Sequence, residues 1–94
     1  MTPEGRVKEL VMAVLMEFGV YYFMPRGTAF GRAGVPDFVC CHKGKFIAIE
    51  TKAGKNRCTP LQIREQEEIL AHVGASLIIN ETNMPELRRV LETM

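Results

Sequence analysis

Two acidic residues and a lysine stand at the ends of two neighbouring apolar segments. Asp37 opens one segment and the motif Glu50-Thr51-Lys52 closes the next, with the turn sequence His42-Lys43-Gly44-Lys45 between them. A tight turn at the centre of that sequence would pair the segments antiparallel, in a register that sets Asp37 directly opposite Glu50. Opposed residues on one sheet face lie about 5 Å apart, and Lys52 would point to the same face about 7 Å further along.

Two carboxylates this close repel each other unless one is protonated or a cation lies between them. We therefore expect Asp37 and Glu50 to bind Mg²⁺, which prefers oxygen ligands and keeps several waters, with the backbone carbonyl of Thr51 as a third ligand. Such an ion polarises a phosphate and lowers the pKa of water, while Lys52 would orient the nucleophile or stabilise negative charge on the phosphate. The three residues together predict phosphodiester hydrolysis. Taken singly, they read as a turn aspartate and an exposed strand pair.

The charge distribution is more informative than the formal net charge of +1. Between Arg26 and Arg64 the only acidic residues are Asp37 and Glu50, in a segment that is otherwise basic. We expect a positive field around the acidic pair, suited to a phosphate backbone. The alternative is an ordinary solvated surface. The residues predicted to contact DNA are Arg26, Arg32, Lys43, Lys55 and Arg57.

Three segments carry helix start and stop signals. The first begins at Thr2 and ends at Gly19, with apolar residues at helical spacing between them. The second begins at Thr59 with a capping-box pattern and extends to Val73, and a short third helix follows Asn83. The inward side of the second helix is predicted to consist of Gln62, Gln66, Ile69, Leu70 and Val73.

Four strands are predicted, at residues 20–24, 38–42, 46–51 and 75–79. The central two have apolar residues on both faces and should be covered on both sides. The order helix, three strands, helix, strand, helix predicts one α/β domain over residues 1–94, with a mixed four-stranded sheet flanked by helices. Residues 25–34 are expected to form a mobile loop that leads to Asp37.

Three motifs in this order resemble one nuclease family. The motifs are Gly34-Val35-Pro36-Asp37, Glu50-Thr51-Lys52 and Thr59-Pro60-Leu61-Gln62. They resemble the VRR-NUC (virus-type replication-repair nuclease) family of the PD-(D/E)xK superfamily, and the likeness extends over essentially the whole chain. The resemblance implies a restriction-endonuclease-like core and cleavage of DNA with Mg²⁺ or Mn²⁺. Asp37 and Glu50 match the metal ligands, Lys52 the catalytic lysine and Gln62 the glutamine of the following helix.

The resemblance also implies partners. Stand-alone viral members of the family look like homodimers that act on branched DNA such as four-way (Holliday) junctions, and longer relatives join this domain to DNA repair modules. The alternative of a different class is a catalytically inactive nucleic-acid-binding module with the same fold. Discrimination between the two requires a cleavage assay.

Two site residues have alternative roles. The resemblance would make Glu4 the acid of the first helix, which approaches the metal directly or through water, but an acid in a first helical turn is also favoured by the helix dipole. Gln62 could hold a phosphate or the attacking water, or could close the capping box begun by Thr59. The two roles of Gln62 are compatible.

Hydropathy, the N-terminal residues and the cysteines argue against a membrane protein, a secreted protein and a zinc protein. No apolar run approaches the roughly 20 residues needed to cross a bilayer, and residues 1–4 lack the features of a signal peptide, so we expect a cytoplasmic protein without membrane contact. The odd number of cysteines fits reduced thiols. A zinc site built from Cys40, Cys41, His42 and Cys58 is disfavoured, because adjacent strand residues point to opposite faces.

Overall fold

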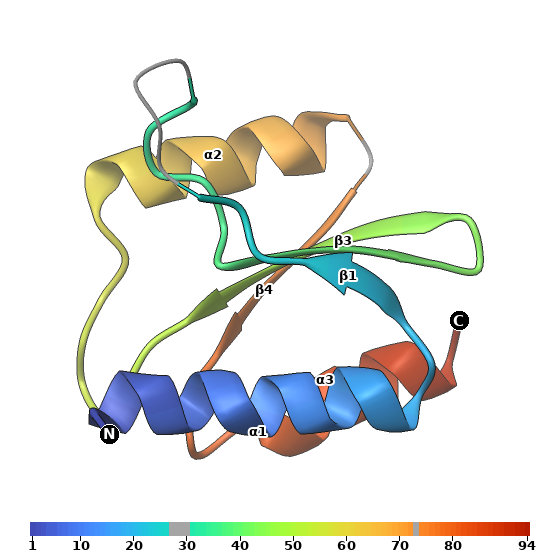
Figure 1. The fold of residues 1–94 in the computed structure, drawn as a ribbon. Helices are drawn as coiled ribbons and strands as arrows, with labels where there is room; N and C mark the ends of the chain where they lie inside the picture. Colours follow the sequence, from blue (N-terminus) through green and yellow to red (C-terminus); the bar gives the residue numbers. More distant parts are fainter. Residues whose placement is uncertain (27–30, 73) are drawn as a thin grey trace.

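A single four-stranded sheet lies between one helix on one face and two helices on the other (Figure 1). This computed structural model describes residues 1–26, 31–72 and 74–94. The elements are α1 (Pro3–Glu17), β1 (Tyr21–Phe23), β2 (Phe38–His42), β3 (Lys45–Thr51), α2 (Pro60–Ala71), β4 (Ala75–Ile79) and α3 (Met84–Glu92). The predicted α/β class, the mixed sheet and the order of elements are all confirmed. None of the helices in the described ranges has the length and apolar character needed to cross a bilayer.

The β2–β3 hairpin has the register predicted from its turn. Lys43 and Gly44 have φ angles of 51° and 79°, as the two central residues of a type I′ turn require. The pairs run from His42↔Lys45 at the turn to Phe38↔Ile49 at the far end. The next pair in this register would be Asp37 and Glu50, so the hairpin brings the two acids to the same end of the sheet.

Strand β3 is central and receives support from both neighbours. It pairs antiparallel with β2 and parallel with β4, which makes the sheet mixed in the order β1-β2-β3-β4. The parallel pairing continues to Thr51↔Ile79, after which the amide of Lys52 donates a hydrogen bond of 3.0 Å to the carbonyl of Ile79. The backbone of Glu50-Thr51-Lys52 is therefore fixed up to the point where the strand ends.

The main core lies between the sheet and the pair α1 and α3. Helix α1 begins at Thr2, whose hydroxyl accepts a hydrogen bond of 3.0 Å from the amide of Gly5, and it buries one apolar stripe. Residues of β2, β3 and β4 meet this stripe from the sheet, and α3 closes it from the side. The fully buried members include Val7, Val11, Leu15, Phe38, Ile47, Ile49, Ile79, Leu87 and Leu91.

The opposite face of the sheet is covered less than predicted. Ala48 is buried, whereas Phe46 is 45% exposed and Cys41 is also exposed. The predicted inward line on α2 is wrong at Leu70, which is 57% exposed. The side chain of α2 that is buried is Glu65. The helix therefore presents polar groups to the sheet, and these groups are used at the site described below.

Element ends differ from the prediction where backbone groups have other partners. Strand β1 lacks Val20, because the amide of Val20 donates 2.9 Å to the carbonyl of Leu15 and closes the end of α1. Strand β3 gains Lys45 through its pairing with His42. The helix expected to reach residue 73 ends at Ala71; residue 73, and residues 27–30 of the predicted loop, lie outside the described residues.

Candidate active site

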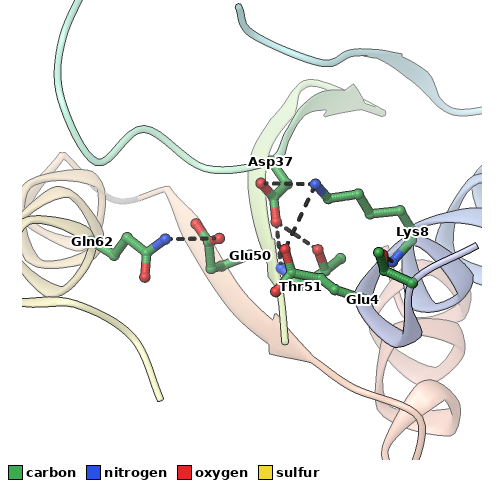
Figure 2. Close-up of polar contacts among 8 residues, drawn as sticks. Glu4, Lys8, Asp37, Glu50, Thr51 and Gln62 are labelled. Carbon is green, nitrogen blue, oxygen red and sulfur yellow. Dashed lines mark hydrogen bonds and ion pairs between the residues drawn. The ribbon is translucent and has the colours of Figure 1, made fainter. Parts of the chain in front are cut away.

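The acidic pair lies where β2 begins and β3 ends. Asp37 stands just before β2, and its Oδ2 accepts two hydrogen bonds from Thr51, 2.9 Å from the amide and 2.6 Å from the hydroxyl (Figure 2). Thr51 is fully buried, so both donors are held rigidly. The hairpin pattern predicted Asp37 as a strand residue directly opposite Glu50. Instead, Asp37 lies outside the strand and its carboxylate is hydrogen-bonded to Thr51, the residue after Glu50. The anchor leaves Oδ1 free of hydrogen bonds to Thr51.

Glu50 is a buried carboxyl group next to a second carboxyl group. It is only 4% exposed, and its Oε1 accepts a hydrogen bond of 3.2 Å from Nε2 of Gln62. The pKa of Glu50 is raised to about 8, chiefly by burial and then by the hydrogen bond and negative charge of Asp37, against which the charge of Lys52 acts. In the absence of a cation, the pair therefore holds a proton at neutral pH.

Lys52 belongs to the same site. It lies two residues after Glu50, hence on the same side of the strand, and is half-buried. Its ammonium group forms no ion pair within 4.0 Å among the described residues, although its charge acts on Glu50. The Lys52 ammonium is therefore available to an anionic ligand.

The main chain of Thr51 offers an oxygen on the Asp37 side. In a strand, the N–H and C=O of one residue point to the same side. Because the Thr51 amide donates to Asp37, its carbonyl faces the same edge of β3. This orientation is compatible with the predicted role of the Thr51 carbonyl as a metal ligand.

Gln62 closes the capping box, as one of its two predicted roles requires, and its side chain also reaches the site. Its side-chain oxygen accepts a hydrogen bond of 2.8 Å from the Thr59 amide, and its own amide donates 3.2 Å to the Thr59 hydroxyl, which completes the capping box. The remaining side-chain group, Nε2, donates to Glu50. Gln62 therefore connects the start of α2 to a site carboxyl group through one of the two N–H donors of its side-chain amide.

Glu4 lies beside the acidic pair but is separated from it by a residue that the sequence reasoning missed. The Nζ atom of Lys8 is 3.8 Å from Glu4 Oε2 and 3.8 Å from Asp37 Oδ1 (Figure 2). The negative charge of Glu4 still acts on Glu50 and contributes to its raised pKa. The spacing of Glu4 and Lys8 by four residues in a predicted helix was the available signal for this pair.

The segment before Asp37 is clamped onto α2. Arg32 donates three hydrogen bonds to Glu65, the shortest being 2.7 Å from Nη2 to Oε2. Gly34 has a φ angle of 73°, and a Cβ atom there would lie 2.6 Å from the carbonyl carbon of Leu61. The guanidinium of Arg32, predicted to contact DNA, is thus engaged with a buried carboxylate, and Gly34 allows the chain to cross α2 at close range.

The other basic residues predicted to contact DNA lie at different distances from the acids. Arg26, Lys55 and Arg57 are exposed. Lys55 and Glu4 both line an open groove of about 550 Å³ between the first turn of α1 and residues 53–56. Lys43 lies at the hairpin turn, seven residues before Glu50, which corresponds to about 23 Å at about 3.3 Å per residue. Its Nζ donates a hydrogen bond of 3.1 Å to the carbonyl of Met94. The structure does not bring Lys43 to the site.

The donor set fits a hard divalent cation that retains water. Among the described residues, no three His, Cys, Asp or Glu side chains converge as a ready-made metal site. What the chain offers is a buried carboxyl, a second carboxyl whose Oδ1 is not hydrogen-bonded to Thr51, and a nearby carbonyl. Two carboxylates completed by water and substrate are a common arrangement for Mg²⁺.

Comparisons with known proteins give one kind of match. No family model matches the sequence. No curated protein matches it either. Among solved structures, one described as a "VRR_NUC domain" superposes with a TM-score of 0.76 over 98% of this chain and 97% of that chain, at 21% sequence identity. The likeness in fold that the three motifs indicated is therefore confirmed over the whole chain.

Proposed function

We propose that this chain is a divalent-metal-dependent endodeoxyribonuclease that hydrolyses phosphodiester bonds. The observation that carries the proposal is the pair formed by the buried Glu50 carboxyl and the partly buried Asp37 carboxyl, with Lys52 at the same end of β3 and without an ion pair among the described residues. The fold likeness to a VRR_NUC domain supports it. Mg²⁺ or Mn²⁺ would be held by these two carboxylates and the Thr51 carbonyl, and Glu4 is near enough to assist through water.

Each residue of the site has a defined task in this proposal. A bound divalent ion would supply Lewis-acid polarisation of the scissile phosphate. Thr51 holds the Asp37 carboxylate in one orientation through two donors, and Gln62 orients Glu50 through one. Lys52 donates to the phosphate oxygen that gains negative charge, or orients the attacking water. The clamp between Arg32 and Glu65 fixes the segment that delivers Asp37.

We further propose that the substrate is branched DNA, such as a four-way junction, and that the protein acts as a homodimer in the cytosol. A two-fold dimer would present two sites to a substrate that is itself nearly two-fold symmetric. The exposed Lys55 and Arg57 follow Lys52 in the chain and are suited to phosphate contacts beside the site.

An apolar surface on the less covered sheet face supports the dimer. Tyr21, Phe23 and Phe46 are 64%, 53% and 45% exposed and line an apolar groove of about 300 Å³ with Val39 and Cys41. Together the three rings expose about 300 Å² if each side chain presents about 200 Å², which is as large as the biggest apolar patch on many monomers. Light scattering tests the dimer: Phe23→Glu should give a monomer, and a monomeric mass for the parent protein would refute it.

Cleavage of a labelled junction tests the activity. A four-way junction and a linear duplex of the same sequence are incubated with Mg²⁺, Mn²⁺ or EDTA. The parent should cut the junction preferentially and only with metal, while Asp37→Ala and Lys52→Ala should lose cleavage and retain binding. Lys45→Ala, at the opposite end of β3, is the matched control and should cut normally. Binding without cleavage by the parent would instead favour the inactive binding module.

A further inference from the structure

The ammonium of Lys8 lies among acids contributed by two distant parts of the chain. Glu4 comes from the first turn of α1, and Asp37 directly precedes β2. An ion pair between Glu4 and Lys8 alone would be an ordinary contact along an exposed helix face. The second contact, to Asp37, sets Lys8 apart, because Asp37 is one of the two carboxylates assigned to the metal.

The position of Lys8 is fixed by the core. Val7 and Val11, on the neighbouring stripe of α1, are buried against the sheet, so the helix cannot rotate to turn Lys8 away. The side chain of Lys8 is 31% exposed and that of Asp37 is 21% exposed, which places the contact at the partly shielded rim of the site. Figure 2 shows the Lys8 side chain directed toward the Asp37 carboxylate.

The contact uses the oxygen that a metal would need. Asp37 Oδ2 accepts from both donors of Thr51, whereas Oδ1 accepts from neither and faces the ammonium of Lys8. The Nζ atom of Lys8 is 3.8 Å from Oδ1, longer than the 2.7–2.9 Å typical of a charge-assisted hydrogen bond. Such a contact neutralises charge without fixing geometry, so a ligand that binds Oδ1 directly can displace it.

We propose that Lys8 is a further positioning residue of the site, a resident counter-ion that competes with the divalent cation for Asp37 Oδ1. It balances Asp37 and Glu4 before metal enters and opposes metal entry by charge repulsion. This inference rests on the proposed function, since it assumes that Asp37 binds metal. A unit charge about 5 Å from a divalent ion lowers its affinity by about tenfold even at water-like screening.

The direction in which metal affinity changes when Lys8 is removed separates a counter-ion role from a purely structural role. A lysine that merely braced α1 against Asp37 would loosen the metal site when removed, and metal affinity would fall. A competing counter-ion gives the opposite result, because its removal frees Oδ1 and eliminates the repulsion.

Calorimetric titration with Mn²⁺ alone, without DNA, tests the inference on the full chain. Lys8→Met should bind Mn²⁺ about tenfold more tightly than the parent, whereas Lys8→Arg, which keeps the charge, should stay close to the parent. Lys45→Met removes the same charge about 17 Å from Glu50 along β3, at about 3.3 Å per residue, and should also match the parent. Circular dichroism checks that each variant folds. If Lys8→Met does not fold, Lys8→Gln replaces it in the titration, because it also removes the charge.

The outcomes distinguish the two levels of the argument. Tighter binding by Lys8→Met, or uptake by that variant when the parent takes up none, supports the counter-ion role. Equal or weaker binding by Lys8→Met overturns it and leaves the proposed metal site intact. Absence of uptake by both proteins overturns the metal site itself.

Discussion

Replacing Glu50 by glutamine should stabilise the metal-free protein. The carboxyl of Glu50 has its pKa raised from the ordinary value of 4.5 to about 8, first by burial and then by its contact with Asp37. A glutamine side chain has nearly the same shape, can still accept from Gln62, and can donate to Asp37 as the protonated acid does. It cannot ionise, so it removes the free-energy cost of keeping this acid protonated in the folded state.

The magnitude follows from the difference between the folded and unfolded pKa values. A group with a raised folded pKa contributes stability that is fully present below pH 4.5 and is lost as the pH rises to about 8. Each pH unit within this window lowers the unfolding free energy of the parent by about 1.4 kcal/mol relative to the variant. Between pH 4.5 and pH 7, the unfolding free energy of the parent should therefore fall by on the order of 3 kcal/mol relative to that of Glu50→Gln.

Urea unfolding in EDTA at several pH values measures this difference. The two proteins should have similar unfolding free energies at pH 4.5, and Glu50→Gln should be more stable by about 3 kcal/mol at pH 7. Glu67→Gln, an exposed position on α2, controls for the change in net charge and should follow the parent. Saturating Mg²⁺ should stabilise the parent and not Glu50→Gln. Equal free energies for parent and variant from pH 4.5 to 8, or a less stable variant at pH 7, would refute the reasoning.

Three further substitutions test the parts that position the acids. Gly34→Ala should lower the unfolding free energy by about 2 kcal/mol or more, because the residue has a φ angle of 73° and its new Cβ would overlap the α2 backbone. Thr51→Val should cost about 1.5–3 kcal/mol, because it removes the 2.6 Å hydroxyl donor to the Asp37 carboxylate, and should lower kcat more than it raises KM. Glu65→Gln should cost about 1 kcal/mol, since a neutral amide weakens the bonds to Arg32. Urea unfolding and single-substrate kinetics measure these effects.

Each of these predictions has a contrary result. Unchanged stability of Gly34→Ala would mean that the chain does not cross α2 so closely. A Thr51→Val variant with parental kcat would show that the hydroxyl does not orient Asp37. A Glu65→Gln protein as stable as the parent would mean that the clamp contributes nothing measurable, as is the case for many exposed ion pairs.

The hairpin geometry could be predicted because local rules determine it. The turn at Lys43-Gly44 fixes the register, and the register fixes which residues of the two strands are neighbours. The pairing Phe38↔Ile49 follows directly, and with it the proximity of Asp37 and Glu50. The capping box at Thr59 is local in the same sense and was also correct.

The contacts that could not be predicted join distant segments. Nothing in the sequence shows that Asp37 accepts from Thr51 in addition to facing Glu50, because this depends on where the chain leaves strand geometry. The polar inner side of α2 is a second case. Helical periodicity favoured Leu70 as an inward residue, but Glu65 is buried instead because Arg32 reaches it from the preceding loop.

Uptake of Mn²⁺ with release of a proton tests the central claim most directly. Calorimetric titration at pH 7, in two buffers of different ionisation enthalpy, reports both the binding and the number of protons released. Because the pKa of Glu50 is about 8 without metal, the account predicts Mn²⁺ binding with release of close to one proton. Absence of Mn²⁺ uptake, or uptake without proton release, would contradict the claim that Asp37 and Glu50 form one cation site.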